Sequence, residues 1–185
     1  MRILVTGANG QLGNEMQVLA KENPQHTYYF TDVQELDICN KDAVWAYIAE
    51  KRIELIVNCA AYTAVDKAED DSELAYKLNS EAPKTLACAA QFNGAAIIQV
   101  STDYVFDHCE KSVVIRTAWL YSTFGNNFVK TMIRLGKERD SLGVIFDQVG
   151  TPTYANDLAQ AIFAIINKGI VPGVYHFSNE GVCSW

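Results

Sequence analysis

The sequence has few of the features that mark several common classes of protein. Basic residues are scarce, because 15 lysines and arginines stand against 22 aspartates and glutamates and give a formal net charge of -7 at pH 7. Nucleic-acid binding needs lysines and arginines clustered on one face, so this composition argues against it. No apolar run approaches the roughly 18 residues of a membrane span, and no signal-peptide pattern precedes Gly7. We therefore expect a cytoplasmic protein with no nucleic-acid partner and no membrane partner.

Closely spaced cysteine pairs are also absent. The five cysteines stand far apart along the chain, and their number is odd. This pattern favours reduced thiols over a disulfide framework or a zinc site, and we expect no bound metal. The sequence contains only four prolines and shows no linker, while its 185 residues are enough for one substantial domain and a little more.

The beginning of the chain carries its most informative pattern. Residues 1–6 form a short apolar run that leads into Gly7, Gly10 and Gly13, and apolar residues then recur at helical spacing. Strand, glycine turn and helix in this order are the context of a dinucleotide-binding fingerprint. One glycine makes the tight turn, one lets the backbone approach a pyrophosphate, and one lets helix and strand pack closely. Any tight strand-to-helix turn could use such glycines, but an acidic residue at the expected distance favours the dinucleotide.

That acidic residue is Asp32, at the end of the second predicted strand. An acidic side chain there usually accepts hydrogen bonds from the ribose 2′-hydroxyl of the cofactor. Its negative charge disfavours a 2′-phosphate, so we expect NADH to be used at least as well as NADPH. A solvated strand-end aspartate with no ligand role is the alternative interpretation.

Strands and helices alternate along the rest of the chain. Apolar runs, several of them continuous as in strands buried on both faces, predict strands at residues 1–6, 28–32, 55–60, 95–102, 112–117, 142–146 and 174–177. Helical spacing and cap signals predict helices near residues 12–20, 40–51, 74–92, 127–139 and 156–167. Repeated strand–helix units indicate an α/β fold with a Rossmann-like, doubly wound parallel sheet.

One junction does not fit this alternation. Only residues 106–111 separate a strand ending near Val105 from the strand that begins at Ser112. A crossover between adjacent parallel strands needs about a dozen residues or more, usually a helix. We therefore predict that a segment is missing between Asp107 and His108. The expected domains are a dinucleotide-binding Rossmann domain over residues 1–146 and an incomplete C-terminal substrate-binding lobe over residues 147–185, interleaved with the last sheet elements.

Three segments follow predicted strands at their carboxyl ends, where open α/β sheets bind their ligands. They are residues 58–69, 101–106 and 116–121. They bring hydroxyl and aromatic side chains, including Thr102, Tyr104 and Trp119, toward one crevice, as expected for a joint cofactor and substrate site. Singly these residues could be a strand-end cap or core aromatics, but their joint occurrence favours the site.

These segments belong to six longer sequence blocks. The blocks are GANGQLG (7–13), NCAAYTAVDKAE (58–69), STDYVFD (101–107), RTAWLYS (116–122), GNNFVKTM (125–132) and DQVGTPTYANDLA (147–159). Together they resemble the extended short-chain dehydrogenase/reductases and, within them, the dTDP-4-dehydrorhamnose reductases. The resemblance covers nearly the whole chain, and VDKAE, STDYVF and DQ-x-G-x-P-T are more specific to this family than the glycine turn.

The resemblance implies an activity and a set of site residues. The activity would be reduction of dTDP-4-dehydro-L-rhamnose to dTDP-L-rhamnose, the last step of dTDP-rhamnose synthesis, with NADH or NADPH as cofactor. Thr102 would be catalytic, hydrogen-bonded to the sugar C4 oxygen. The cofactor would lie against Gly7, Gly10, Gln11, Leu12, Gly13, Asp37, Ile38, Ala60, Ala61, Tyr62 and Thr63. The nucleotide sugar would lie against Val65, Tyr104 and Trp119 at the deoxysugar and Asn126, Asn127, Gln148 and Pro152 nearer the lobe.

The sequence departs from the family pattern at the proton donor. In the family a Tyr-x-x-x-Lys pair lies on the helix between the STDYVF and RTAW strands, and the lysine lowers the phenol pKa. That helix is the part that is missing here. The one literal match, Tyr47 with Lys51, falls on an earlier predicted helix, and we interpret it as coincidental.

Two other functions remain open at this point. A non-catalytic dinucleotide-binding protein, like the regulatory subunit of methionine adenosyltransferase, would suit a true deletion of Tyr-x-x-x-Lys. An epimerase or dehydratase acting on another nucleotide sugar would share the fold. The sequence does not fix the oligomeric state, for which a homodimer is one option.

Overall fold

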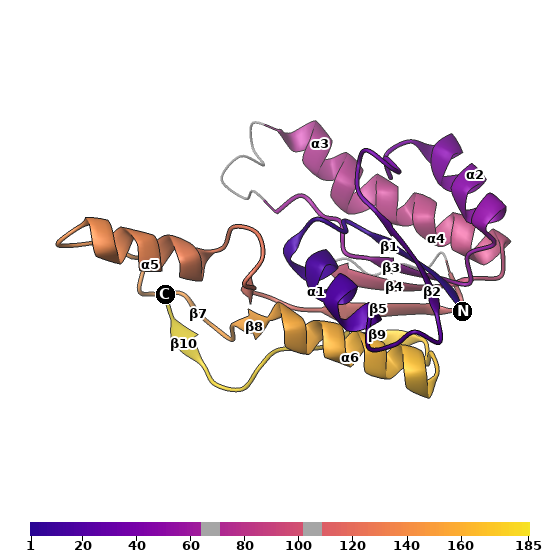
Figure 1. Cartoon of the computed structure of the whole chain (residues 1–185). Helices are drawn as coiled ribbons and strands as arrows, with labels where there is room; N and C mark the ends of the chain where they lie inside the picture. The colour runs from indigo at the N-terminus through magenta and orange to yellow at the C-terminus, as the bar shows by residue number, and fades with distance from the viewer. Residues whose placement is uncertain (64–70, 102–108) are drawn as a thin grey trace.

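The computed structural model describes residues 1–63, 71–101 and 109–185 of the chain. Its centre is a six-stranded parallel sheet in the order β2-β1-β3-β4-β5-β9 (Figure 1). The neighbouring strands pair in parallel throughout this sheet. The strands are β1 (Arg2–Thr6), β2 (Thr27–Thr31), β3 (Leu55–Asn58), β4 (Ala96–Ser101), β5 (Ser112–Arg116) and β9 (Gly173–His176).

Helices cover both faces of the sheet. One face carries α1 (Gln11–Ala20) and α6 (Ala155–Lys168), and the other carries α2 (Lys41–Lys51) and α4 (Ala82–Phe92) (Figure 1). Alternate strand residues point to opposite faces. Ile3 and Val5 therefore pack with α1 and α6, while Leu4 packs with α2 and α4, and all three are fully buried. The Rossmann-like doubly wound sheet predicted from the sequence is confirmed.

The helix that precedes β4 is not uniform. It begins as α3 (Ser72–Tyr76), widens into a π-helical stretch, η2 (Lys77–Glu81), and continues as α4. The apolar spacing predicted a single helix ending near Asn93, and its end is confirmed at Phe92. Single π-helical turns inside α-helices are frequent at functional sites.

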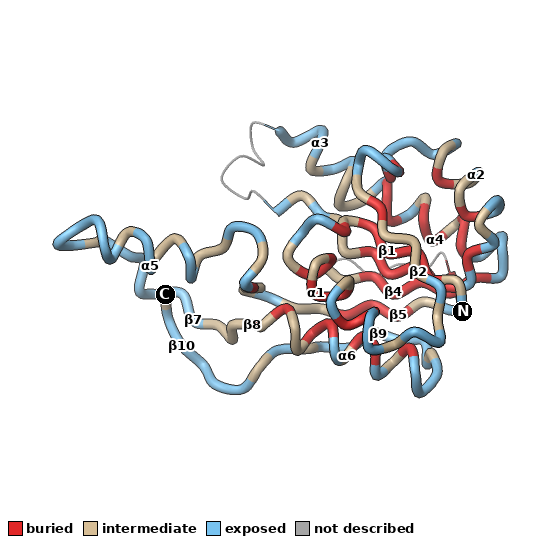
Figure 2. The backbone as a smooth tube through the Cα atoms, viewed as in Figure 1, coloured by how far each residue is buried: buried red, intermediate tan, exposed pale blue. Residues whose placement is uncertain are grey.

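The part of the chain after β5 forms smaller elements. The short strand β6 (Leu120–Tyr121) pairs in parallel with β8 (Thr153–Tyr154), and β7 (Val149–Gly150) pairs antiparallel with β10 (Cys183–Ser184). Helix α5 (Phe128–Glu138) lies with β7 and β10 beyond the end of the sheet, and their backbone is largely exposed (Figure 2).

The strand predicted at residues 142–146 is wrong. These residues, all of them described, have no strand conformation, and Val144, Ile145 and Phe146 are exposed. Their apolar character resembles that of a strand, but a strand also needs a partner in register. The chain pairs three residues later, where Val149 lies opposite Ser184.

The junction between β4 and β5 is confirmed as a connection between adjacent parallel strands. Residues 102–111 are all that the chain provides for it, and residues 102–108 lie outside the described part of the structure. Among the described residues, no helix has the length and apolar character needed to cross a membrane.

Candidate dinucleotide and substrate site

At two positions of the turn between β1 and α1, only glycine fits. Gly7 has φ +65°, and a Cβ there would lie 2.7 Å from the backbone Cα and N of Ala60. A Cβ on Gly13 would overlap the Gly7 carbonyl oxygen and lie 2.6 Å from the Ala8 Cα. Gly10 is less confined, since its Cβ would meet only the Gly7 carbonyl oxygen, at 3.2 Å. Close backbone packing thus accounts for Gly7 and Gly13, and the open side of Gly10 leaves space for a ligand.

The N-terminus of α1 is free of a side-chain cap. Its N-cap residue is Gly10, and no described side chain accepts a hydrogen bond from the first turn in the capping manner. By contrast, the Asn40 side chain caps α2 by accepting from the Ala43 N–H, and Asn127 caps α5 by accepting from the Lys130 N–H. Uncapped N–H groups and the helix dipole make an anion site, so this turn fits the pyrophosphate of a dinucleotide.

Asp32 follows β2 directly and lies beside the glycine turn. One of its carboxylate oxygens accepts a hydrogen bond from the Asn9 N–H (3.0 Å), and the other accepts one from the Val33 N–H (2.8 Å). Each oxygen keeps a further lone pair for a ribose hydroxyl. A little further along, Asp37 is exposed and its carboxylate accepts from the Cys39 N–H, whereas Ile38 is buried in the core under α2 and α4.

Residues 60–63 leave the carboxyl end of β3 next to the glycine turn. The Ala60 N–H donates to the Asn58 side chain (3.2 Å). The backbone of Tyr62 is held on both sides by Asn79 of η2, whose amide oxygen accepts from the Tyr62 N–H (2.8 Å) and whose amide nitrogen donates to its carbonyl (3.0 Å). Ala61 and Thr63 are exposed. No local sequence pattern marks Asn79, because its partner is 17 residues away and its role depends on the π-helical stretch.

A buried polar network runs across three strands just beneath this site. Thr6 donates its hydroxyl to the Asn58 amide oxygen (2.5 Å), and the Asn58 amide nitrogen donates to the Gln99 amide oxygen (2.7 Å). Thr6, Asn58 and Gln99 are register partners on β1, β3 and β4. None of these three residues was among the predicted site residues; the signal for the network in the sequence is a polar residue near the carboxyl end of each apolar strand.

Two contacts join α1 to the segment that leads into α5. The Asn127 amide donates to the Gln11 side chain (3.0 Å), so two predicted site residues from distant parts of the sequence meet. Glu15 is only 3% exposed, and its carboxylate accepts from the Ser122 hydroxyl (2.6 Å) and the Asn156 amide (3.0 Å). Asn126, by comparison, is exposed. The glycine turn and the segment that leads into α5 are thereby fixed to each other.

Trp119 and Gln148 both contact Trp185, which was not among the predicted site residues. The indole of Trp185 stacks on that of Trp119 with ring centroids 3.8 Å apart, and its N–H donates to the Gln148 amide oxygen (2.8 Å). Pro152, half-buried, comes immediately before β8. Val65, Thr102 and Tyr104 lie outside the described residues, so the structure does not place them.

Tyr47 and Lys51 lie on α2, which leads into the amino end of β3 rather than away from its carboxyl end. Lys51 pairs with Glu50 (2.8 Å), and its ammonium group is 6.0 Å from the centroid of the Tyr47 ring. Burial raises the pKa of Tyr47. The charge of Lys51 lowers this pKa in turn, but not enough to cancel the effect of burial. A catalytic tyrosine needs a lowered pKa, so this environment does not favour an acid–base role.

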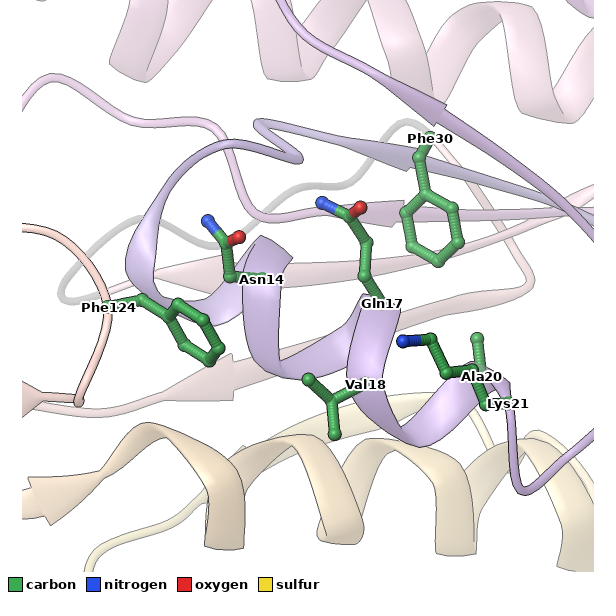
Figure 3. A pocket seen from close by; sticks show the side chains of 7 residues that line it. All are labelled: Asn14, Gln17, Val18, Ala20, Lys21, Phe30 and Phe124. Carbon is green, nitrogen blue, oxygen red and sulfur yellow. The ribbon is translucent and has the colours of Figure 1, made fainter.

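A surface hollow of about 630 Å³ lies along the outer side of α1, with Phe124 near one end and Phe30 near the other (Figure 3). None of the predicted site residues lines it. Its lining consists of Asn14, Gln17, Val18, Ala20, Lys21, Phe30 and Phe124.

The parallel sheet, the glycine turn and the uncapped α1 define a Rossmann-type dinucleotide-binding protein. Comparison with known proteins narrows this class. The family model described as the RmlD substrate binding domain matches residues 1–108 and 107–185, which together span the chain. The chain belongs to the dTDP-4-dehydrorhamnose reductase family.

Individual relatives agree with this assignment. The dTDP-4-dehydrorhamnose reductase of Aggregatibacter actinomycetemcomitans is 40% identical over 221 residues, covering 100% of this chain and 75% of that protein. The Escherichia coli K12 enzyme of the same name is 38% identical with the same coverage. A crystal structure of the Clostridium acetobutylicum reductase is 45% identical with a TM-score of 0.93, covering 100% of this chain and 76% of its own. The Bacillus anthracis reductase in complex with NADP is 39% identical with a TM-score of 0.91, covering 100% and 77%.

Proposed function

We propose that this protein reduces the C4 carbonyl of dTDP-4-dehydro-L-rhamnose to the alcohol of dTDP-L-rhamnose, using NADPH or NADH. The observation that carries this proposal is the glycine turn before an uncapped helix, in a chain 37–40% identical to proteins named for that reaction. A bound reduced nicotinamide would supply the hydride. The activity needs a protein that holds the dinucleotide, places the sugar and delivers a proton to the C4 oxygen.

The cofactor half of the site has the most structural support. The uncapped turn at Gly7, Gly10 and Gly13, with Gln11 and Leu12, would hold the pyrophosphate. Asp32 would accept from the ribose hydroxyls, and Asp37 with Ile38 would flank the adenine. Residues 60–63, which Asn58 and Asn79 hold in place, would line the ribose and nicotinamide.

The substrate half rests on fewer structural contacts. Trp119 would lie against the deoxysugar with Val65 and Tyr104, and Gln148 and Pro152 would lie nearer the nucleotide-sugar lobe. Asn126 and Asn127 would share that role, and the Gln11–Asn127 hydrogen bond supports it by joining the start of α5 to the cofactor turn. Thr102 would donate a hydrogen bond to the C4 oxygen as charge develops on it.

The proton donor would come from a segment between Asp107 and His108 that contains Tyr-x-x-x-Lys. Two observations support this segment. The two matches to the family model meet at residues 107–108, and the alignment with the Aggregatibacter enzyme extends over 221 residues although this chain has 185. Intact-mass measurement on protein made from its own gene is expected to exceed 20.5 kDa by several kilodaltons. A mass equal to that of the printed chain would instead favour a non-catalytic dinucleotide-binding role.

Substitution of Thr102 tests the catalytic proposal. Thr102→Val keeps the β-branched shape and removes the hydroxyl. Loss of one oxyanion donor typically lowers turnover on the order of 100-fold, roughly 3 kcal/mol. We expect the rate of dTDP-4-dehydrorhamnose reduction to fall by this factor. NADH binding, measured by fluorescence titration, is expected to stay near normal. Turnover within about threefold of the parent would show that the hydroxyl has no catalytic role.

Retention of the cofactor distinguishes an epimerase from a reductase. An epimerase keeps its NAD through the cycle, whereas a reductase exchanges it, so we expect the cofactor to be lost rapidly on gel filtration. The UDP-glucose 4-epimerase of Thermus thermophilus is only 16% identical despite a TM-score of 0.80, and this likeness concerns the fold alone. We further propose that the protein acts in the cytoplasm, in keeping with its odd number of unpaired cysteines.

A further inference from the structure

The backbone of Trp119 is strained. Among the described residues other than glycine, only Arg52 and Trp119 have a positive φ, and that of Trp119 is +51°. Large side chains seldom adopt this left-handed conformation, which is unfavourable and persists only where the surroundings fix it. Such residues cluster at functional sites, where surrounding contacts hold them in place.

Three contacts hold it. Its carbonyl oxygen accepts a hydrogen bond from the Thr153 N–H (3.1 Å) at the start of β8. Gly150 lies against its indole so closely that a Cβ there would be 2.9 Å from two ring atoms. The indole of Trp185 stacks on it at 3.8 Å between centroids with the planes 25° apart. The backbone and the ring plane of Trp119 are therefore both determined by residues more than 30 positions later in the chain.

Trp185 is itself held in place. Its indole N–H donates to the Gln148 amide oxygen (2.8 Å), and the Phe128 ring packs against it with centroids 4.2 Å apart. The pairing of β7 with β10 places Ser184 opposite Val149, which brings Trp185 beside the Gln148 segment. These contacts bring together, around one indole, the residue before β6, the start of α5, the residue before β7 and the end of the chain after β10.

We propose that Trp185 is a positioning residue for the nucleotide sugar: it fixes the plane of the Trp119 indole against Gly150 so that Trp119 presents a defined edge to the sugar. This inference rests on the proposed function, in which Trp119 contacts the deoxysugar. Trp185 acts through Trp119 and through Gln148, which its N–H orients. A preformed aromatic surface lowers the entropy that sugar binding must otherwise overcome.

Binding of the reaction product tests the proposal without requiring turnover. Isothermal titration calorimetry with dTDP-L-rhamnose is expected to show about tenfold weaker binding in Trp185→Leu than in the parent. Binding of NADPH is expected to change less than twofold, because the cofactor would lie against the glycine turn and not against Trp119 or Gln148. Trp185→Phe keeps a ring on Trp119 and is expected to recover most of the affinity.

The matched control is Trp45→Leu. Trp45 lies on α2 and packs against Phe92 with centroids 5.3 Å apart, so this change removes a tryptophan–aromatic contact away from the lobe. It is expected to leave dTDP-L-rhamnose binding unchanged. A loss of binding as large as that in Trp185→Leu would show a general effect on folding and overturn the positioning role.

A spectroscopic signal reports on the stack itself. The chain has three tryptophans, of which Trp119 and Trp185 are stacked. Two stacked indoles couple their transitions, so the parent is expected to show a circular-dichroism couplet that disappears in Trp185→Phe and persists in Trp45→Leu. A couplet unchanged in Trp185→Phe would contradict the stack.

The remaining outcomes separate the inference from the proposed function. If the parent binds dTDP-L-rhamnose and Trp185→Leu binds it within twofold of the parent, the positioning role is overturned and the proposed function stands. If the parent binds NADPH but no dTDP-L-rhamnose, the proposed function is overturned. The role of Trp185 in sugar binding is then overturned as well.

Discussion

The sheet body, meaning the six-stranded sheet with α1, α2, α4 and α6, is held together differently from the lobe formed by α5, β7 and β10. In the sheet body, Leu4, Ile56 and Ile98 are completely buried. None of the eleven residues of α5, all of them described, is buried, and Phe146, between α5 and β7 in the chain, is 86% exposed. Burial of apolar area stabilises the sheet body, whereas directed hydrogen bonds and ring stacks place the lobe.

This difference has a functional consequence. A dinucleotide site needs a fixed turn, and the packed strands provide one that a single added methyl group would disturb. In the proposed function the lobe places the nucleotide sugar, and the segment that leads into it contacts α1 through a few polar side chains, chiefly at Gln11 and Glu15. Elements that rest on few buried contacts open at low free-energy cost, which suits the part of an enzyme that admits its substrate.

The largest expected effect is that of a methyl group added at Gly13. Gly13→Ala places a Cβ into the backbone of Gly7 and Ala8, so we expect a loss of unfolding free energy of about 3 kcal/mol or more and loss of NADPH binding. Gly136→Ala, in α5, meets no described atom within 4 Å and is expected to stabilise the protein by about 0.5–1 kcal/mol. Urea unfolding of both variants measures the two changes in unfolding free energy. Equal changes would contradict the difference in packing between the sheet body and the lobe.

Next in size is the loss of the buried amide at Asn58. Asn58→Ala leaves Thr6 and Gln99 without a shared partner in a fully buried position, so we expect about 2–3 kcal/mol of destabilisation. The control is Asn167→Ala on α6, which removes an exposed amide bonded to Asn23, and about 0.5 kcal/mol or less is expected there. Thermal and urea unfolding distinguish the two, and a negligible cost at Asn58 would mean that water replaces the network.

A smaller effect is expected where the two regions are joined. Ser122→Ala removes a donor to the buried Glu15 carboxylate and the acceptor of the Phe124 N–H, at a cost of about 1–2 kcal/mol. Hydrogen exchange is expected to rise in residues 123–139 more than in β1 or β3. Thr123→Ala, at an exposed neighbour, serves as the control and is expected to change neither quantity. Uniform acceleration across the sheet would show that the lobe is not separately anchored.

The smallest effect concerns the choice of cofactor. Asp32→Ser removes a negative charge from the end of β2, and we expect the affinity for NADPH relative to NADH to rise roughly fivefold, about 1 kcal/mol. Its side chain also accepts the Asn9 N–H, so serine, which keeps an acceptor, is preferred to alanine. Calorimetric titration with both cofactors provides the ratio. A ratio that does not change would mean that Asp32 does not contact the ribose.

Most of the sheet body could be predicted because its signals are local. The run Leu55–Asn58 is apolar at every position before its last residue, and Asn40 is followed by a helical pattern. Each element can therefore be predicted from a few neighbouring residues. The lobe gave weaker signals. Residues 142–146 are apolar enough to suggest a strand, but the pairing of β7 with β10 joins positions more than 30 residues apart, which no local pattern contains.

The sequence alone determined the parallel α/β fold, the glycine turn, the acidic residue after β2 and the family to which the chain belongs. Each of these depends on periodicity or on short motifs, which are properties of neighbouring residues. Only the tertiary structure decided that Asn79 holds Tyr62, that Glu15 joins α1 to Ser122, and that Trp185 stacks on Trp119. These contacts link residues 17, 107 and 66 positions apart, so they exist only once the sheet and the lobe have brought their elements together.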